Sequence, residues 1–181
     1  MREIIFATTN EGKLAEAREI LEIEVVGNSL DIDEIQSLDP VEVAVKKAQA
    51  YFKELAKPIF IEDVSLSFDA LNGLPGTYIN DFSKALGNAG LCSLIIGEDR
   101  EASAMTVLVY KDDENEEVFE GIVKGKIAES PRGDNGFGWD AIFIPEGETR
   151  TFAEMEMEEK NKYSMRKNAL EKFKKWLESQ N

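Results

Sequence analysis

Histidine is absent from this chain of 181 residues. That absence excludes catalytic triads and metal sites that use imidazole, and it leaves acid–base chemistry to carboxylates, lysine, tyrosine or metal-bound water. Cysteine is nearly absent too: Cys92 is the single one, so the chain cannot form an internal disulfide. Because Cys92 lies in the apolar run 91–96, we expect a buried and unreactive thiol.

Long hydrophobic runs and basic residues are also scarce. No apolar run approaches the ~20 residues of a membrane span, and the start of the chain lacks a signal-peptide pattern, so we expect a cytoplasmic location. Lys and Arg number 21 against 36 Asp and Glu, a formal net charge of −15. That charge disfavours long nucleic acid and anionic membranes as partners. A phosphate substrate would need a divalent cation and a few lysines or arginines converging in one cleft.

The residue patterns predict an α/β fold in a single domain over residues 1–181. Hydrophobic residues make up 43% of the chain, which is enough for a folded core. Strands are expected at 4–7, 23–26, 58–61, 102–110, 118–127 and 141–144, and helices from about 13, at 41–55, at 82–96 and at about 158–178. An acidic turn joins the two long strands, which predicts an antiparallel hairpin and therefore a mixed sheet.

The most informative motif is the acidic pair Glu62-Asp63, which follows the apolar strand at 58–61 and precedes a Gly/Pro loop at 71–78. Ligands of α/β proteins bind where strands end. Carboxylates placed there could bind Mg²⁺, and one could take a proton from an attacking water. Because successive side chains of a strand alternate, we expect only one of the two to enter a cleft. A solvated pair of acids explains the motif equally well.

A polar turn, 8–13, joins the first strand to the first helix. The hydroxyls of Thr8 and Thr9, the Asn10 amide and the free N–H groups of the helix N-terminus could hold an anion, and Lys13 adds a positive charge. The alternative is an ordinary N-capped turn, since the glycine spacing of a Walker motif is missing.

A loop at 133–140 ends in Phe137-Gly138-Trp139-Asp140. Its glycines allow a ligand to approach the backbone, an aromatic ring could stack on a base, and Asp140 could accept hydrogen bonds from base N–H groups. The alternative is a glycine-rich turn whose aromatic residues belong to the core.

Four cations gather at 160–167, at the start of the predicted last helix. Lys160 and Ser164 are four residues apart and could point together, with Arg166 further round the helix. Contacts to a polyphosphate or a base would explain this cluster. A solvated helix face that balances the acids at 154–159 is the alternative.

In order and combination, these motifs closely resemble the inosine triphosphate pyrophosphatase family, which removes non-standard purine nucleoside triphosphates. The resemblance runs nearly end to end, from 6–13 to 169–170. Its most specific segments are 62–63 with 70–76, then 136–140, then 151–155 with 159–161.

The resemblance implies an elongated mixed β-sheet with flanking helices, two lobes around a central cleft, and a homodimer. It implies Mg²⁺-dependent hydrolysis of a small-molecule substrate, a purine nucleoside triphosphate such as ITP, dITP or XTP, to the monophosphate and pyrophosphate. Two alternatives remain: a pyrophosphatase for other modified or pyrimidine nucleotides, and a nucleotide-binding module without turnover.

The resemblance also implies roles for single residues. Asp63 matches the general base, and Glu34 in Glu34-Ile35-Gln36 matches a metal ligand, with Asp63 as a second ligand. Met165 stands where the family has histidine, and Val64-Ser65 replace a Ser-Gly-like pair. Since Met cannot donate a hydrogen bond, base selection would either be looser or depend more on Arg166 and Asp140. The residues implied to bind substrate are Thr8, Thr9, Asn10, Lys13, Lys47, Phe137, Gly138, Trp139, Asp140, Lys160, Ser164 and Arg166.

Overall fold

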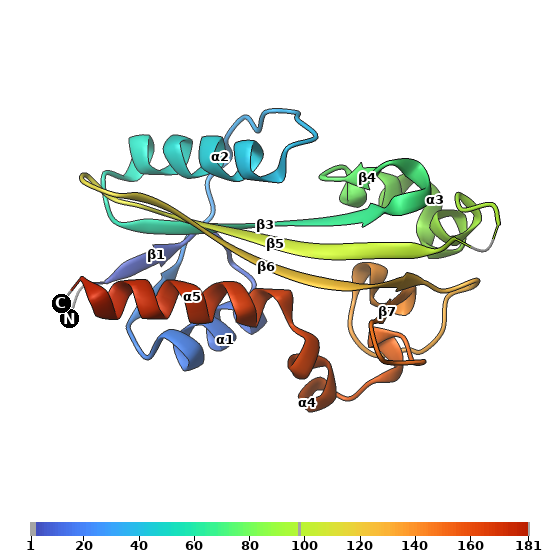
Figure 1. Cartoon of the computed structure of the whole chain (residues 1–181). Coiled ribbons are helices and arrows are strands. Elements are labelled where there is room, and N and C mark those ends of the chain that lie inside the picture. Colours follow the sequence, from blue (N-terminus) through green and yellow to red (C-terminus); the bar gives the residue numbers. More distant parts are fainter. Residues whose placement is uncertain (1–2, 98, 181) are drawn as a thin grey trace. The chain divides into compact units, whose positions relative to one another are not determined.

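A computed structural model describes residues 3–97 and 99–180 and confirms the α/β class (Figure 1). Seven strands form one mixed sheet, in which β4 (Pro75–Gly76) pairs with β3 off the main path. Along that path the order is β2 (Val25–Gly27), β1 (Ile4–Phe6), β3 (Ile59–Phe68), β5 (Glu101–Lys111), β6 (Glu116–Ile127) and β7 (Phe143–Pro145). The four residues between β5 and β6 confirm the predicted hairpin, because so short a connection joins only antiparallel neighbours.

The chain divides into two compact units. Unit 1 comprises Met1–Asp63, Thr106–Gly121 and Arg166–Asn181, and unit 2 comprises Val64–Met105 and Ile122–Met165. The expectation of one domain with a central cleft stays a prediction. In the described residues, no helix is long and apolar enough to cross a membrane.

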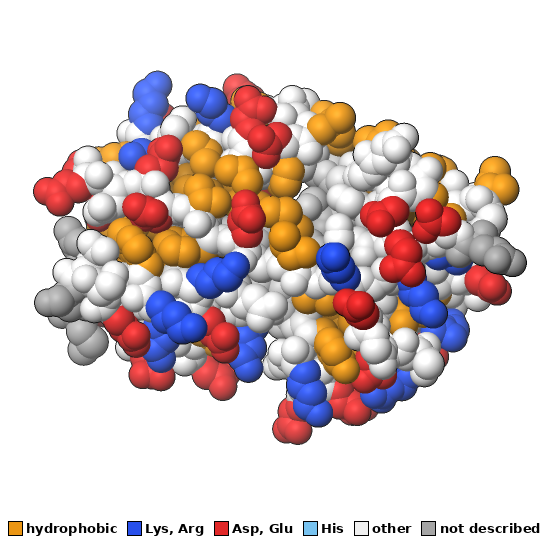
Figure 2. Space-filling model, viewed as in Figure 1, with side chains coloured by type: hydrophobic (Ala, Val, Ile, Leu, Met, Phe, Trp, Pro, Cys, Tyr) orange, Lys and Arg blue, Asp and Glu red, His pale blue; other side chains and the backbone are white. Residues whose placement is uncertain are grey.

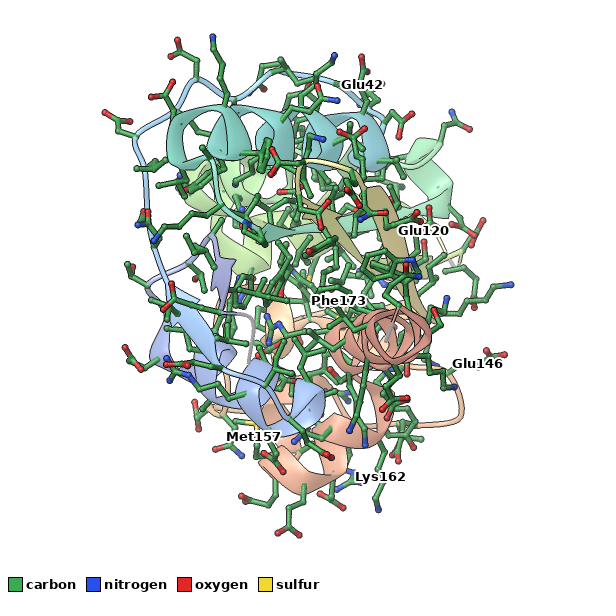
Figure 3. All side chains as sticks on the ribbon, turned by 90° about the vertical axis from the view of Figure 1, so that its left-hand side faces the viewer. Glu42, Glu120, Glu146, Met157, Lys162 and Phe173 are labelled. Carbon is green, nitrogen blue, oxygen red and sulfur yellow. The ribbon has the colours of Figure 1, made fainter. Side chains whose placement is uncertain are left out.

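In unit 1, β1 pairs in parallel with β2 and β3. Helix α2 (Pro40–Leu55) covers one face of these strands, and α1 (Glu11–Leu21) and α5 (Met165–Ser179) cover the other (Figure 1). Asp39 caps α2 through the N–H groups of its first turn, as its Asp-Pro start predicts. On the α5 side, Phe173 points into the interior (Figure 3) and packs 5.4 Å from Phe60, centroid to centroid.

In unit 2, α3 (Ile79–Ser93) packs against a core of aromatic and aliphatic side chains. The helix breaks at Gly87, whose φ of +65° is favourable for glycine alone. Strand β7 pairs antiparallel with β6. Cys92 is buried in the same core, and burial raises the pKa of its thiol, as expected for an unreactive cysteine.

Strand β3 is longer than predicted. It continues from Ile59 to Phe68, so the pair Glu62-Asp63 lies within the strand and not at its end. Polar residues at 62, 63, 65 and 67 interrupt the apolar run, but Leu66 and Phe68 keep the two-residue alternation and are fully buried. Pairing of Leu66 and Ser67 with β4 extends the strand in a way that the apolar run does not reveal.

The single C-terminal helix predicted at 158–178 is wrong. A short helix α4 (Met157–Lys160) and a 3-10 turn at Asn161–Tyr163 precede α5. Ser164 between them has extended backbone angles, φ −73° and ψ 113°, which end one helix and suit the residue before the next. The four-residue helical spacing of Lys160 and Ser164 therefore does not apply. The last strand also begins later than predicted, at Phe143, because Gly138–Ala141 forms a 3-10 turn.

Candidate active site

Glu62 is the anchor of a buried ion-pair network in unit 1. Its side chain is 1% exposed, and Arg166 donates to both carboxylate oxygens, from Nε at 2.6 Å and Nη2 at 3.0 Å. Lys13 Nζ lies 3.1 Å from the same carboxylate, and Arg166 Nη1 donates to Glu16 at 2.9 Å. Burial alone would raise the pKa of Glu62, but Arg166 and Lys13 outweigh it and hold the pKa below its usual range.

This network joins α1, β3 and α5 through four charges that sum to zero. Two of its members, Lys13 and Arg166, were expected to bind substrate, and the structure places both on Glu62. The network also raises the pKa of Arg166, against the effect of its burial, so the guanidinium stays charged. A charged, bidentate guanidinium of this kind fixes the Glu62 side chain in one orientation.

Asp63, the next residue along β3, has a different environment. Within residues 3–97 and 99–180 it forms no ion pair and accepts no hydrogen bond, since none of the contacts found there involves its carboxylate. Burial raises the pKa of Asp63 to about 6; Lys47 and Lys13 oppose the rise, and the charges of Glu34 and Glu62 add to it. The opposite orientation of neighbouring strand residues separates a paired acid from an unpaired one.

Glu34 pairs with Lys47 on α2, and both residues lie near Asp63. Lys47 Nζ is 2.6 Å from Glu34 Oε1, and the Glu34 side chain is 45% exposed. Both residues influence the pKa of Asp63, so these three predicted residues lie together in unit 1. Lys13 also acts on Asp63, which adds the second predicted lysine to the group.

Glu34 and Asp63 supply carboxylates that could hold a magnesium ion together with the phosphate oxygens of a ligand. Mg²⁺ usually keeps several waters and takes one or two carboxylates together with phosphate oxygens. Asp63 lacks a cationic partner, and burial, with a smaller contribution from the charges of Glu34 and Glu62, raises its pKa. A divalent cation would supply the opposite charge that this buried carboxylate lacks. In the part of the chain that the structure describes, no group of three or more Asp, Glu or Cys is arranged to hold an ion.

The turn at 8–13 caps α1, which agrees with the alternative interpretation of this motif as an ordinary N-capped turn. Asn10 Oδ1 accepts from the Lys13 N–H at 3.0 Å, and the Asn10 N–H donates to Thr8 Oγ1 at 3.2 Å. Thr9 and Asn10 are exposed. An anion could still approach this exposed helix N-terminus, because the cap satisfies only some of its N–H groups.

A second group of predicted residues lies in unit 2 around Asp140. Asp140 is buried, and its Oδ2 accepts from Lys160 Nζ at 2.6 Å and from the Phe137 N–H at 2.9 Å. A side chain at Gly136 would collide with this carboxylate, because its Cβ would lie 2.2 Å from Oδ2. Lys160 also lies 5.3 Å above the Phe137 ring, which is 67% exposed.

Two other predicted residues of this loop, Gly138 and Trp139, contact other parts of unit 2. Trp139 is buried in the unit 2 core against Phe143, so it fits the core alternative. The Gly138 carbonyl accepts from Asn88 on α3 at 2.8 Å. Ser164 is half-buried before α5. Of the two departures from the family pattern, Met165 packs on the unit 2 core and Ser65 is buried.

Sequence reasoning missed two residues of this site, Glu16 and Tyr51. Glu16 meets Arg166, which is 150 residues away, so no local spacing connects them. Tyr51 holds the segment that carries Glu34 through the Leu30 backbone. Its place one helical turn after Lys47 was the only available signal.

On the face shown in Figure 2, acidic and basic side chains are interspersed, without one large basic field.

Comparison with known proteins gives matches over almost the whole chain. A model of the Ham1 family matches residues 4–176. A dITP/XTP pyrophosphatase of Methanopyrus kandleri is 43% identical over 98% of this chain and 97% of its own. An inosine triphosphate pyrophosphatase of Yarrowia lipolytica is 45% identical over 96% and 95%. The solved structure of a HAM1 protein from Coxiella burnetii covers 99% of this chain and 100% of its own, with 32% identity and a TM-score of 0.89.

Proposed function

Because the chain belongs to the Ham1 family, we propose that it hydrolyses the purine nucleoside triphosphates ITP, dITP and XTP to the monophosphate and pyrophosphate. The relatives named above are pyrophosphatases for these nucleotides, and the similarity covers nearly the full length of both chains. A hydrolase of this kind would remove them from the nucleotide pool of the cytoplasm.

The observation that carries the proposal is the setting of Asp63. An unpaired carboxylate with a pKa of about 6 is mostly ionised at neutral pH and still basic enough to take a proton from water. Ionised carboxylates with ordinary pKa values are weaker bases. Asp63 therefore serves as the general base for a water that attacks the α-phosphorus.

The remaining residues of the unit 1 group bind and orient the polyphosphate. Lys13 and Lys47 can bind phosphate oxygens and offset the charge that develops on the departing pyrophosphate. Glu34 and Asp63 would hold Mg²⁺, which supplies further charge stabilisation and orientation when bound. The exposed N–H groups beside Thr8, Thr9 and Asn10 add donors for a phosphate.

In unit 2, Asp140 and Lys160 are the candidates for reading the base. Lys160 can donate to a 6-oxo group, whereas a 6-amino purine offers it no acceptor there. A buried donor left unpaired costs about 1–3 kcal/mol, or roughly a factor of 5 to 150 in kcat/KM. Phe137, exposed beside Lys160, can stack on the base.

A panel of nucleotides tests this function. Purified protein is incubated with Mg²⁺ and ITP, dITP, XTP, ATP or dTTP, and phosphate is measured with and without added inorganic pyrophosphatase. We expect phosphate only after the coupling enzyme is added, and far more from ITP, dITP and XTP than from ATP and dTTP. Turnover of pyrimidine nucleotides at equal rates, or tight ITP binding without release, would contradict the proposal.

The proposal includes a homodimer, the usual assembly of the family that the sequence resembles. Light scattering coupled to size-exclusion chromatography measures it directly: a mass near twice 20.3 kDa is expected, and a mass near 20.3 kDa contradicts it.

A further inference from the structure

The segment that carries Glu34 lies along α2 and is tied to it at three points. Leu30 is bonded to Tyr51, Glu34 to Lys47, and Ser37 to Glu42. From Leu30 to Ser37 along the segment, the partner residues on α2 follow in reverse sequence order, from Tyr51 to Glu42. The segment and the helix therefore run antiparallel in a fixed register.

This attachment matters because residues 28–38 contain no helix or strand. Such a segment has no internal backbone ladder, so the place of Glu34 depends on contacts with its neighbours. The Glu34–Lys47 pair cannot supply that place alone, since a half-exposed ion pair contributes little and Glu34 would give up part of it to bind metal.

Tyr51 provides the firmest of the three contacts. Its ring is 4% exposed in unit 1, and its hydroxyl accepts from the Leu30 N–H at 3.1 Å and donates to the Leu30 carbonyl at 3.3 Å. Both bonds go to backbone atoms, so they fix the path of the chain whichever rotamer the segment's side chains adopt. Tyr51 and Lys47 are four residues apart on α2 and so face the segment together.

We propose that Tyr51 is a positioning residue for the metal-binding carboxylate: its hydroxyl fixes the segment 28–38 and thereby holds Glu34 in place to bind a divalent cation. This inference rests on the proposed function for the role of Glu34. The contacts of the hydroxyl, however, belong to the free protein and can be tested without substrate.

The variant Tyr51→Phe removes the hydroxyl and keeps the buried ring. The matched control is Tyr110→Phe, because Tyr110 is also buried in unit 1 and its hydroxyl donates to Asp112 in the β5–β6 turn at 2.8 Å. Three measurements compare the variants: hydrogen exchange of peptides that cover 28–38, the affinity for Mn²⁺ alone by electron paramagnetic resonance, and the Mg²⁺ concentration that gives half-maximal turnover of ITP.

In Tyr51→Phe we expect exchange in 28–38 to accelerate roughly threefold to tenfold and Mn²⁺ affinity and half-saturating Mg²⁺ to worsen by a similar factor, the range for one or two lost hydrogen bonds. The rate at saturating Mg²⁺ should stay near that of the wild type, and Tyr110→Phe should change none of these quantities. In a Glu34→Gln background the Tyr51 variant should weaken Mn²⁺ binding no further.

Unchanged exchange in 28–38, unchanged Mn²⁺ affinity, or a wild-type protein that binds no Mn²⁺ would each overturn the inference. An equal loss in the Glu34→Gln background would overturn it too, since Tyr51 would then act independently of Glu34. Failure of the proposed function looks different: the wild type then hydrolyses none of the nucleotides, while exchange and Mn²⁺ binding still respond to the hydroxyl.

Discussion

Replacing Arg166 by methionine tests whether the Glu62 network stabilises unit 1. The change leaves Glu62, whose side chain is 1% exposed, with Lys13 as its remaining cationic partner at 3.1 Å. Breaking one partner of a buried ion pair costs about 3–5 kcal/mol, and the surviving lysine places this case near 3 kcal/mol. With a urea m-value of about 2 kcal/mol per M, the unfolding midpoint should fall by about 1.5 M.

The measurement is urea unfolding followed by circular dichroism, with Arg150→Met as the matched control. Arg150 also pairs with two acids, Glu148 and Glu159, but its side chain is 41% exposed, so its loss should cost far less stability than the loss of Arg166. The double variant Glu62→Leu with Arg166→Met should recover most of the stability, because it leaves no buried charge unpaired. If Arg166→Met costs no more than Arg150→Met, the reasoning about this network is wrong.

Three further predictions address the sites and the pH response. Asp63→Asn should lower kcat for ITP by at least about 100-fold while calorimetry still detects ITP binding, since an amide cannot act as the base; near-normal turnover would remove Asp63 from that role. Lys160→Met should raise KM for ITP about tenfold, whereas Lys162→Met, a change at an exposed lysine (Figure 3), should not; equal effects would refute a specific contact. Burial would raise the pKa of Asp112, but hydrogen bonds from the Glu114 N–H, Tyr110 and Asn115 hold that pKa below its usual range. The contribution of Asp112 to folding stability is therefore complete above its unfolded-state pKa and is lost as pH falls through its folded-state pKa. Asp112→Asn should therefore lower stability at pH 7 by about 1–3 kcal/mol and flatten the decline on acidification, as read by thermal unfolding; a parallel decline in both proteins would contradict the assignment.

Local sequence signals predicted the elements whose boundaries are set locally. The helix after Asp39-Pro40 begins where its cap and proline require, and the β5–β6 hairpin forms around the acidic turn. In each case the residues that determine the boundary lie within a few positions of it.

Tertiary contacts explain the failures. Strand β3 continues past Asp63 because β4 pairs with it, and no apolar run signals that pairing. The predicted C-terminal helix breaks at Ser164, although the residues on both sides favour helix, because the chain leaves unit 2 for unit 1 between Met165 and Arg166. Helical periodicity continues across such a break, so it cannot reveal where a chain changes from one packed core to another.

The same limit applies to the charges of the site. A net charge of −15 disfavours long nucleic acid as a partner, but it does not determine the sign of the potential near Asp63. That sign depends on pairs formed over long sequence separations: Arg166 and Lys13 neutralise Glu62, while Lys47 neutralises Glu34 and leaves Asp63 unpaired. Sequence reasoning placed a carboxylate pair at 62–63 but could not say which member would be neutralised, because the deciding cation is 104 residues away from Glu62. The resulting division, a charged anchor beside a carboxylate with a pKa of about 6, arises from burial and tertiary pairing acting on two adjacent acids.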